Sequence, residues 1–530
     1  MELLRVVTIG ASYAPIIAVL YGLLIIVYRL FFHPLNSFPG PFASRLSDLY
    51  GAYFASRTAL HRRTHRDHIK YGPVIRHGPN KLVFNSVSAL QAIYQNDQVT
   101  KSRAYLVSQR APDTYSLWNA LDQDLHRSKR KIIGQVVSER SMKAFEPTMM
   151  EEIDTFIRLI FLSTQAEPQT PINMTERCKW LGIDIVGHLS FAYPLNLQTD
   201  PMYRFIIDSA ATANYFLNIN MQMPPLAVFH AELFIYLRAV MRGKSYLRTI
   251  QKMIKARLAK DKHAEHDFYS LVTEGKTLSK EESIWTSEIW SEAIFFLTAG
   301  GDTTPTGMSA LFFYLARNPR CYQRLAEEIR ATFGTAAEIR NGPKLASCSY
   351  LRACFDEALR MSPPTAGTLW RQQVVNRGRQ PEPLVVDGHV IPPGTQIGVN
   401  IYSIHHNEQY FPRPFTYLPE RWLPGCPEYQ TTNRNAFIAF STGPRGCAGK
   451  AMAYLEASLV IAKTLWYFDF EEVASDTQKS KRSEDDEANE YQLNDIVVST
   501  HDGPWLRFSP RAECKAELGT ANMLQSVSIV

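Results

Sequence analysis

The clearest signal in this sequence lies in the segment Phe440–Lys450, which contains one cysteine, Cys447, among glycines at positions 443, 446 and 449. Glycines let a loop turn tightly, so that backbone N–H groups can point at the sulfur atom. An apolar run with helical spacing follows the cysteine, which predicts that the sulfur lies near the N-terminus of a helix. Both features favour a thiolate over a thiol. The segment therefore predicts a functional cysteine rather than an ordinary buried one.

The residues around the cysteine indicate its role. A thiolate is a strongly electron-donating ligand of haem iron, and Arg445 supplies a positive charge suited to a haem propionate. The segment resembles the Phe-x-x-Gly-x-Arg-x-Cys-x-Gly signature of the haem-thiolate monooxygenases, the cytochrome P-450 superfamily. Phe440, Gly443, Arg445, Cys447 and Gly449 all agree with it. The resemblance implies that Cys447 is the axial iron ligand of haem b and that the other four residues belong to the cofactor-binding loop.

The segment Ala299–Pro305 is the second signal. It places two glycines and Pro305 inside an apolar helical run, although a glycine costs roughly 1 kcal/mol and a proline about 3 kcal/mol relative to alanine there. By itself it predicts either a bulge beside a small ligand or a break between two helices, with Asp302 as the cap. The resemblance implies a bulge on the distal side of the haem, where Thr303 positions dioxygen and Asp302 relays protons. We expect the Thr303 hydroxyl to bond back to the carbonyl of Ala299.

A charge network is the third expectation. Glu357 and Arg360 have the i, i+3 spacing of a common helical pair, which means little alone. However, Pro419-Glu420-Arg421-Trp422 follows, and the order resembles the Glu-x-x-Arg helix and the Pro-Glu-Arg-Phe segment of the same superfamily, with Trp422 in place of the usual phenylalanine. The resemblance implies that Glu357, Arg360 and Arg421 form a buried network that supports the fold.

Three further residues are assigned to the haem propionates by resemblance. His126 and Arg130 lie on one face of a predicted helix, where a solvated basic face is the alternative. Arg371 follows a proline pair and resembles another propionate ligand. His405 is either a histidine near the haem edge or a core histidine with satisfied hydrogen bonds.

The N-terminus predicts a membrane anchor. Residues 6–28 form an apolar run without charge, about the length of a bilayer-spanning helix. A cleaved signal peptide would have a shorter apolar core and a small-residue cleavage site. Arginines downstream place the remainder in the cytosol. We expect a Pro-rich hinge at 29–45, a catalytic domain at 46–511 and an unpacked tail at 512–530. The sequon at Asn173 should stay unmodified in the cytosol.

Composition and periodicity indicate one globular domain. Hydrophobic residues make up 45% and charged residues 20%, and the net charge of +6 comes without a dense basic face, which excludes a nucleic-acid binder. The seven scattered cysteines indicate a reducing compartment. Residues 120–335 are mainly helical in pattern, whereas strands are expected within 73–95 and 383–404. The expected fold is mainly α with a small β portion, and resemblance makes it the haem-thiolate monooxygenase fold with an N-terminal transmembrane helix.

The resemblance also implies an activity. The implied activity is that of a monooxygenase, which uses dioxygen to oxidise a hydrophobic small molecule. The segments Tyr28–Leu35 and Tyr71–Arg76 resemble those of filamentous-fungal members that act in secondary metabolism. No dinucleotide-binding loop follows a strand, so electrons should come from an NADPH-dependent flavoprotein reductase of the endoplasmic reticulum membrane. Two alternatives are a dioxygen-independent isomerase or dehydratase, against which Asp302 and Thr303 argue, and a haem protein without catalysis.

By the same resemblance, the expected substrate cavity has aromatic walls and no evident charge, which predicts a neutral, ring-containing substrate. The expected lining residues are Tyr105, Tyr115, Trp118, Tyr215, Phe216, Phe295, Phe296, Ala366 and Gly367.

Overall fold

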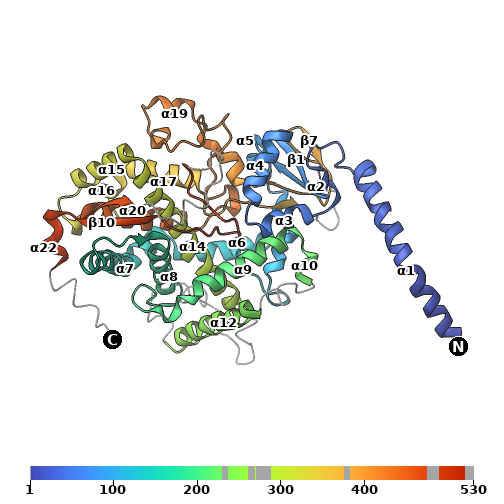
Figure 1. Cartoon of the computed structure of the whole chain (residues 1–530), viewed down its shortest axis with the longest axis horizontal. Helices are drawn as coiled ribbons and strands as arrows, with labels where there is room; N and C mark the ends of the chain where they lie inside the picture. Colours follow the sequence, from blue (N-terminus) through green and yellow to red (C-terminus); the bar gives the residue numbers. More distant parts are fainter. Residues whose placement is uncertain are drawn as a thin grey trace.

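Helices form most of the molecule, as the periodicity predicts. The structure is a computed structural model that describes residues 2–228, 237–260, 269, 288–374, 382–473 and 489–519, with side chains from residue 13 onward except 228 and 237–242. The longer helices of the domain are α4 (Leu60–Tyr71), α6 (Gln123–Val136), α7 (Glu139–Ala166), α8 (Met174–Phe191), α9 (Phe205–Gln222), α12 (Leu237–Leu258), α14 (Glu288–Arg317), α15 (Pro319–Thr332), α17 (Ser349–Met361) and α20 (Lys450–Tyr467) (Figure 1).

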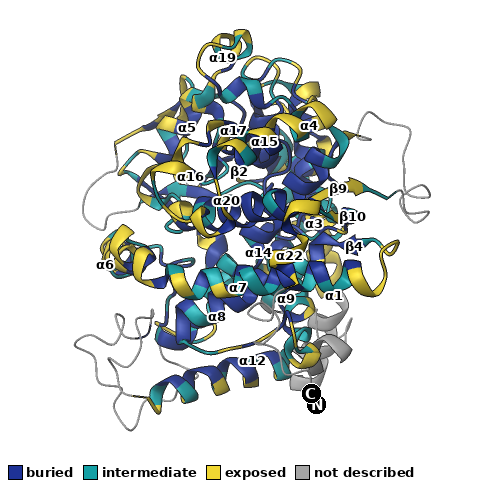
Figure 2. Ribbon diagram, turned by 90° about the vertical axis from the view of Figure 1, so that its left-hand side faces the viewer, coloured by how far each residue is buried: buried dark blue, intermediate teal, exposed yellow. Residues whose placement is uncertain are grey.

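Helix α14 is the central element, and it packs against α8, α17 and α20. Figure 2 shows these helices as mostly buried ribbons inside the domain. Pro305 lies inside α14, which runs on without interruption, so the alternative of two separate helices is wrong. The glycines of α14 also have a packing role, because a Cβ at Gly301 would meet Ile183 Cδ1 of α8 at 2.6 Å. Glycine on both helices lets them approach closely: a Cβ at Gly182 would lie 2.4 Å from Pro305 Cγ.

The predicted strands are present at both places. Three antiparallel pairs and one parallel pair form a five-stranded sheet of order β1-β2-β8-β5-β3. The parallel pair is β2 with β8, in which Lys81 pairs with Gln396. Its strands are β1 (Val74–Gly78), β2 (Lys81–Phe84), β8 (Gln396–Val399), β5 (Arg371–Gln373) and β3 (Val99–Lys101). The hairpin of β6 (Leu384–Val386) and β7 (His389–Ile391) turns at Asp387 and Gly388, both with positive φ. A third sheet joins β4 (Ile172–Asn173), β10 (Trp505–Pro510) and β9 (Phe468–Glu472).

Shorter helical segments connect these layers. Those that bear on the site are α3 (Leu49–Ser56), α5 (Val87–Tyr94), η2 (Arg103–Ser108), α18 (Ile401–His405), η6 (Pro419–Trp422) and η8 (Gly443–Arg445).

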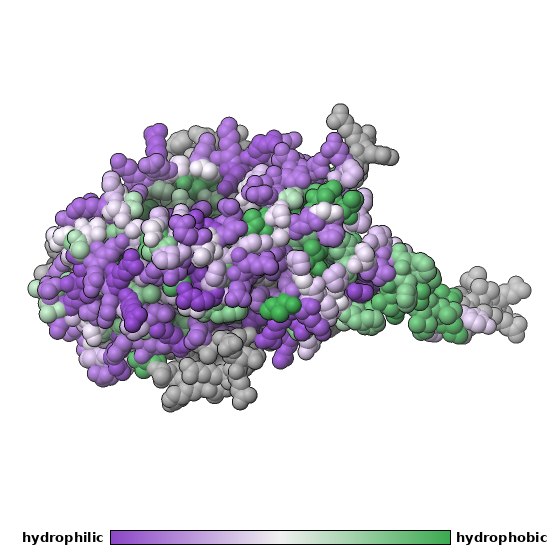
Figure 3. All heavy atoms as spheres, turned by 90° about the horizontal axis from the view of Figure 1, so that it is seen from above, coloured by the Kyte–Doolittle hydropathy of each residue, from purple (hydrophilic) through white to green (hydrophobic). Residues whose placement is uncertain are grey.

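The N-terminal helix projects away from the domain (Figure 1). It comprises α1 (Glu2–Val27) and a π-helical turn, η1 (Tyr28–Phe32), so helical structure continues four residues beyond the predicted end at residue 28. The span Tyr13–Phe32 is long and apolar enough to cross a membrane, and none of it is buried. Figure 3 shows this apolar surface beside the mostly hydrophilic face of the domain. The following hinge is fixed to the sheet, because Arg76 N donates to Pro39 O at 2.7 Å.

The C-terminal tail differs from the expectation. Residues 512–519 pack onto the domain, with η10 (Ala512–Cys514) and α22 (Lys515–Leu518). Cys514 and Leu518 are buried, and the Tyr467 hydroxyl donates to Glu517. The prediction that the chain is unpacked from residue 512 is therefore wrong for these residues, and 520–530 lie outside the described part of the chain.

Candidate functional site

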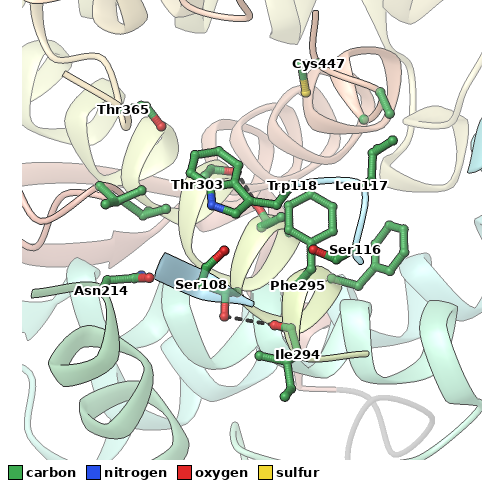
Figure 4. Close-up of a pocket in the computed structure, with 18 of the residues that line it drawn as sticks. Ser108, Ser116, Leu117, Trp118, Asn214, Ile294, Phe295, Thr303, Thr365 and Cys447 are labelled. Carbon is green, nitrogen blue, oxygen red and sulfur yellow. Dashed lines mark hydrogen bonds between the residues drawn. The ribbon is translucent and has the colours of Figure 1, made fainter. Parts of the chain in front are cut away.

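A cavity of about 840 Å³ lies inside the domain, and Cys447 and Thr303 reach it from different elements, as Figure 4 shows. Cys447 comes from the loop before α20, and Thr303 comes from α14. Of the predicted site residues, the cavity is lined by His126, Arg130, Thr303, Arg371, Phe440, Arg445, Cys447 and Gly449. Gly443, Asp302, Glu357, Arg360 and Arg421 are not among the lining residues.

The cysteine loop is as tight as the glycines predict. Gly443 has a φ of +71°, and a Cβ there would lie 1.9 Å from the carbonyl oxygen of Tyr94 at the end of α5. No other residue fits that position. Cys447 N donates to Phe440 O at 2.8 Å, which closes the loop and presents the thiol to the cavity.

The Cys447 thiol is exposed to the cavity while protein atoms surround it on its other sides. That burial raises the pKa of the thiol, whereas a backbone N–H of Gly449 and the charges of Arg130 and Lys450 lower it. The predicted amide donor is thus present at Gly449. A metal ion bound to sulfur deprotonates a thiol outright, so an iron ion held here would supply the stabilisation of the thiolate that the protein alone leaves incomplete.

Five basic side chains line the cavity near this loop: Lys101, His126, Arg130, Arg371 and Arg445. Burial, and then the charge of Arg371, lower the pKa of Arg445 to about 10. Burial, and then Arg445, lower the pKa of His126 to about 3. Within the described part of the chain, none of the five forms an ion pair with a carboxylate. Three arginines of like charge beside a neutral histidine fit a ligand with two carboxylates, and the haem propionates are such a pair.

The contacts of these cations refine the predictions. Arg445 donates to Thr100 Oγ1 at 2.9 Å and Leu121 O at 2.8 Å, which fixes its guanidinium at the cavity wall. Arg130 donates to Gly446 O at 2.6 Å and Cys447 O at 3.1 Å, so it also holds the cysteine loop itself. The alternative of a solvated basic face is wrong for this side of α6. Lys101 was not predicted, because a single lysine at the end of a strand carries no sequence signal.

Thr303 and Asp302 point in different directions although they are adjacent. The hydroxyl of Thr303 donates to Ala299 O at 2.6 Å, which confirms the predicted bond, and the side chain faces the cavity. Asp302 is buried against α8, where it pairs with Lys179 at 3.3 Å, and both side chains are about 6% exposed. The pairing was missed because Lys179 lies in a helix whose pattern gives no partner.

The predicted charge network is present and larger than expected. Arg360 donates to both oxygens of Glu357 at 2.8 and 2.9 Å, and Arg421 donates to Oε1 at 3.2 Å. Glu357 also accepts from Leu418 N at 3.1 Å and from the indole N–H of Trp422 at 3.0 Å. The tryptophan that departs from the superfamily pattern therefore contributes a hydrogen bond that phenylalanine could not make.

His405 and Asn173 are both buried inside the domain. His405 is fully buried: its Nε2 accepts from Ile438 N at 2.9 Å, which leaves Nδ1 to donate to Arg360 O at 3.1 Å. The core alternative therefore holds for this histidine. Asn173 caps α8, and its buried amide donates to Asp502 Oδ1 at 3.0 Å, so it is not accessible for glycosylation.

The predicted substrate walls are correct in part. Tyr105, Trp118, Phe216, Phe295 and Phe296 line the cavity, whereas Tyr115, Tyr215, Ala366 and Gly367 do not.

Tyr215 is turned away, because its hydroxyl donates to Ser56 O at 3.0 Å. The expectation that the walls of the substrate cavity carry no charged side chain is wrong, because Arg110 lines this cavity.

Comparisons with known proteins agree with this geometry. A family model described as Cytochrome P450 matches residues 47–489. The chain is similar to the Cytochrome P450 monooxygenase poxM of Penicillium oxalicum, with 33% identity over 98% of each chain. It is also similar to the Cytochrome P450 monooxygenase apf7 of Gibberella fujikuroi, with 31% identity over 93% of this chain and 97% of the relative. The similarity to AKT7 of Alternaria alternata, described in the same way, is 31% over 91% and 94%.

Proposed function

Because the chain belongs to the cytochrome P450 family and is a haem monooxygenase of that family, we propose that it oxidises a largely apolar, ring-containing small molecule. The observation that carries the proposal is the single cavity that Cys447 and Thr303 share, with aromatic walls beside them. Trp118 stacks on Phe295 with ring centroids 6.4 Å apart and contacts Tyr105 at 4.9 Å. The relatives are described as monooxygenases, which leaves the isomerase and the non-catalytic alternatives without support.

The cofactor in this proposal is haem b, whose iron the Cys447 thiolate would hold. When bound, the haem supplies dioxygen activation and the oxidising equivalent; the protein supplies the ligand, the pocket and the protons. Arg371 and Arg445 would neutralise the propionates, the neutral His126 could donate a hydrogen bond to one of them, and Arg130 holds the loop that carries Cys447. The sequence contains no Cys-x-x-Cys-His motif for covalent attachment, which supports a non-covalent haem.

Thr303 and Asp302 deliver protons in this proposal. Since the Thr303 hydrogen is donated to Ala299 O, its oxygen lone pairs face the cavity and can accept a hydrogen bond from a water there. Asp302 is held on the other side of α14 by Lys179. When Asp302 exchanges Lys179 for water and takes up a proton from solvent, its carboxyl group can pass that proton to the water beside Thr303. The ion pair with Lys179 therefore fixes the position of the Asp302 carboxylate between turnovers.

The test compares three variants in the reductase-coupled holoenzyme. Thr303→Ala should keep haem and substrate binding, yet form less product and more hydrogen peroxide per NADPH, because the proton is no longer positioned. Thr303→Ser should restore most of the coupling. Asp302→Asn should slow NADPH use by about 10²–10⁴-fold, the usual range for a positioned proton donor. Full coupling in Thr303→Ala would overturn these roles.

The partner and the membrane complete the proposal. Electrons come from an NADPH-dependent flavoprotein reductase, and the N-terminal helix anchors the protein in the endoplasmic reticulum membrane with the domain in the cytosol. The apolar span and the arginines after it support that orientation. The fungal relatives support a role in secondary metabolism. NADPH consumption on addition of a microsomal reductase tests the electron donor: no consumption with any such reductase would exclude it.

A further inference from the structure

Arg110 is a second, separate cation of the cavity. It follows η2 by two residues and lines the cavity. Its side chain is exposed, and the protein around it desolvates it enough to lower its pKa. The cations near Cys447 influence one another, and Arg110 is not among their neighbours. Its electrostatic neighbour is Tyr246 of α12. Arg110 is therefore not part of the group that fits the propionates.

Within the described residues, Arg110 forms no ion pair and no hydrogen bond. Its side chain is exposed rather than packed, and it lines the cavity. A partly desolvated guanidinium that faces a cavity without a carboxylate beside it fits an anionic ligand there. Glu456 is the only acidic side chain among the described residues that line the cavity, and it does not appear among the electrostatic neighbours of Arg110.

Asn214 is an independent sign of a polar ligand. This residue of α9 lines the cavity, is only 6% exposed, and its amide Nδ2 has no hydrogen-bond partner. Figure 4 shows Asn214 and Ser108 beyond Thr303 as seen from Cys447. Tyr246 lines the same cavity. Two donors without a partner among the described residues, Arg110 after η2 and Asn214 of α9, therefore line the same cavity.

We propose that Arg110, with the amide of Asn214, forms a subsite for a carboxylate of the substrate, remote from the position that is oxidised. The guanidinium presents a planar fork of donors that matches a carboxylate. The aromatic walls between this subsite and Thr303 then hold the apolar body of the same molecule. The inference rests on the proposed monooxygenase function and narrows its substrate class to carboxylic acids with an apolar, ring-containing body.

Probes that bind at both ends test the subsite without knowledge of the substrate. A series of ω-(imidazol-1-yl)alkanoic acids of increasing chain length is titrated into the holoenzyme, beside the matching primary amides. The imidazole nitrogen ligates the haem iron and shifts the Soret band, which gives a dissociation constant for each probe. At one chain length the acid should bind at least about tenfold more tightly than the amide, as expected for hydrogen bonds to a charged group.

Variants assign that preference to residues. Arg110→Gln should reduce binding of the acid to the level of the amide and leave the amide within about twofold, while Arg110→Lys should retain part of the preference. Asn214→Asp should weaken the acid more than the amide through like-charge repulsion. Arg103→Gln is the matched control, because this exposed arginine of η2 does not line the cavity and should leave the preference intact.

The outcomes separate the subsite from the function. An equal affinity of acid and amide at every chain length would overturn the subsite, and so would an Arg110→Gln variant that weakens both probes alike. A Soret shift with every probe still supports the haem cavity in those cases. Failure of the proposed function looks different: the protein would bind no haem, or no probe would ligate its iron.

Discussion

Replacing Gly182 by alanine tests how the contact between α8 and α14 supports the site. An added Cβ would lie 2.4 Å from Pro305 Cγ, 3.1 Å from Pro305 Cδ and 3.4 Å from Gly301 O. Carbon atoms in contact need about 3.5–4 Å, and a proline ring cannot rotate away. The two helices must therefore separate by about 1 Å at this point. Lys179 precedes the contact on α8 and Asp302 precedes it on α14, so their 3.3 Å ion pair lengthens as well.

The expected magnitude is a balance of two terms. Alanine gains roughly 1 kcal/mol over glycine in a helix interior, whereas overpacking of a close contact costs about 1–3 kcal/mol. Because the clash involves rigid groups on both helices, the cost should exceed the gain, with a net loss of up to about 2 kcal/mol. That loss lowers the midpoint of thermal unfolding by a few degrees.

Thermal unfolding of the holoenzyme, followed at the Soret band, measures the loss, and product formed per NADPH measures its effect on the site. Gly134→Ala is the matched control, because nothing lies within 4 Å of a Cβ at that position in α6. It should be neutral or stabilising by up to about 1 kcal/mol. A Gly182→Ala protein as stable and as well coupled as Gly134→Ala would refute the reasoning.

The remaining predictions concern a network, a buried acid and the anchor. Glu357→Gln leaves the buried charges of Arg360 and Arg421 without a carboxylate, so stability should fall by about 3–5 kcal/mol, measured as haem loss on heating. Burial raises the pKa of Glu456 from 4.5 to about 8, so the folded protein holds this proton longer than the unfolded chain and loses stability as pH rises through that interval. Glu456→Gln should be more stable than the wild type at pH 8, by up to about 4 kcal/mol, and equal to it near pH 4.5; a constant difference across denaturant titrations at both pH values would contradict this. Deletion of residues 1–28 should partly release a haem-containing protein from membranes, whereas the full chain should resist carbonate extraction; its recovery in the soluble fraction would exclude a membrane span.

Local patterns in the sequence predict local structure well in this chain. The glycines and the helix after Cys447 fix the loop, and the turn residues fix the hairpin at Asp387. The Thr303 hydroxyl bond follows from a threonine four residues after a carbonyl in a helix. Each of these depends on a few neighbouring residues, whose geometry the backbone dictates.

Contacts between residues that lie far apart in the sequence could not be predicted from it. Periodicity places Asp302 on a helix but does not give its partner, so the contact with Lys179 appears only in the folded chain. The hydrogen bond from the Trp422 indole to Glu357 and the position of Arg110 in the cavity wall also appear only in the folded chain. The packing of Leu518 depends on a surface made by other helices, which a short C-terminal segment does not reveal.

The identity of the iron ligand is tested most directly by the absorption spectrum of the reduced carbon monoxide complex. With Cys447 as the axial thiolate, the purified protein should show the Soret band at the long wavelength that thiolate-ligated haem gives. Cys447→Ala should lose that band. A wild-type spectrum with the shorter-wavelength band of imidazole-ligated haem, or a long-wavelength band that persists in Cys447→Ala, would contradict the assignment of Cys447.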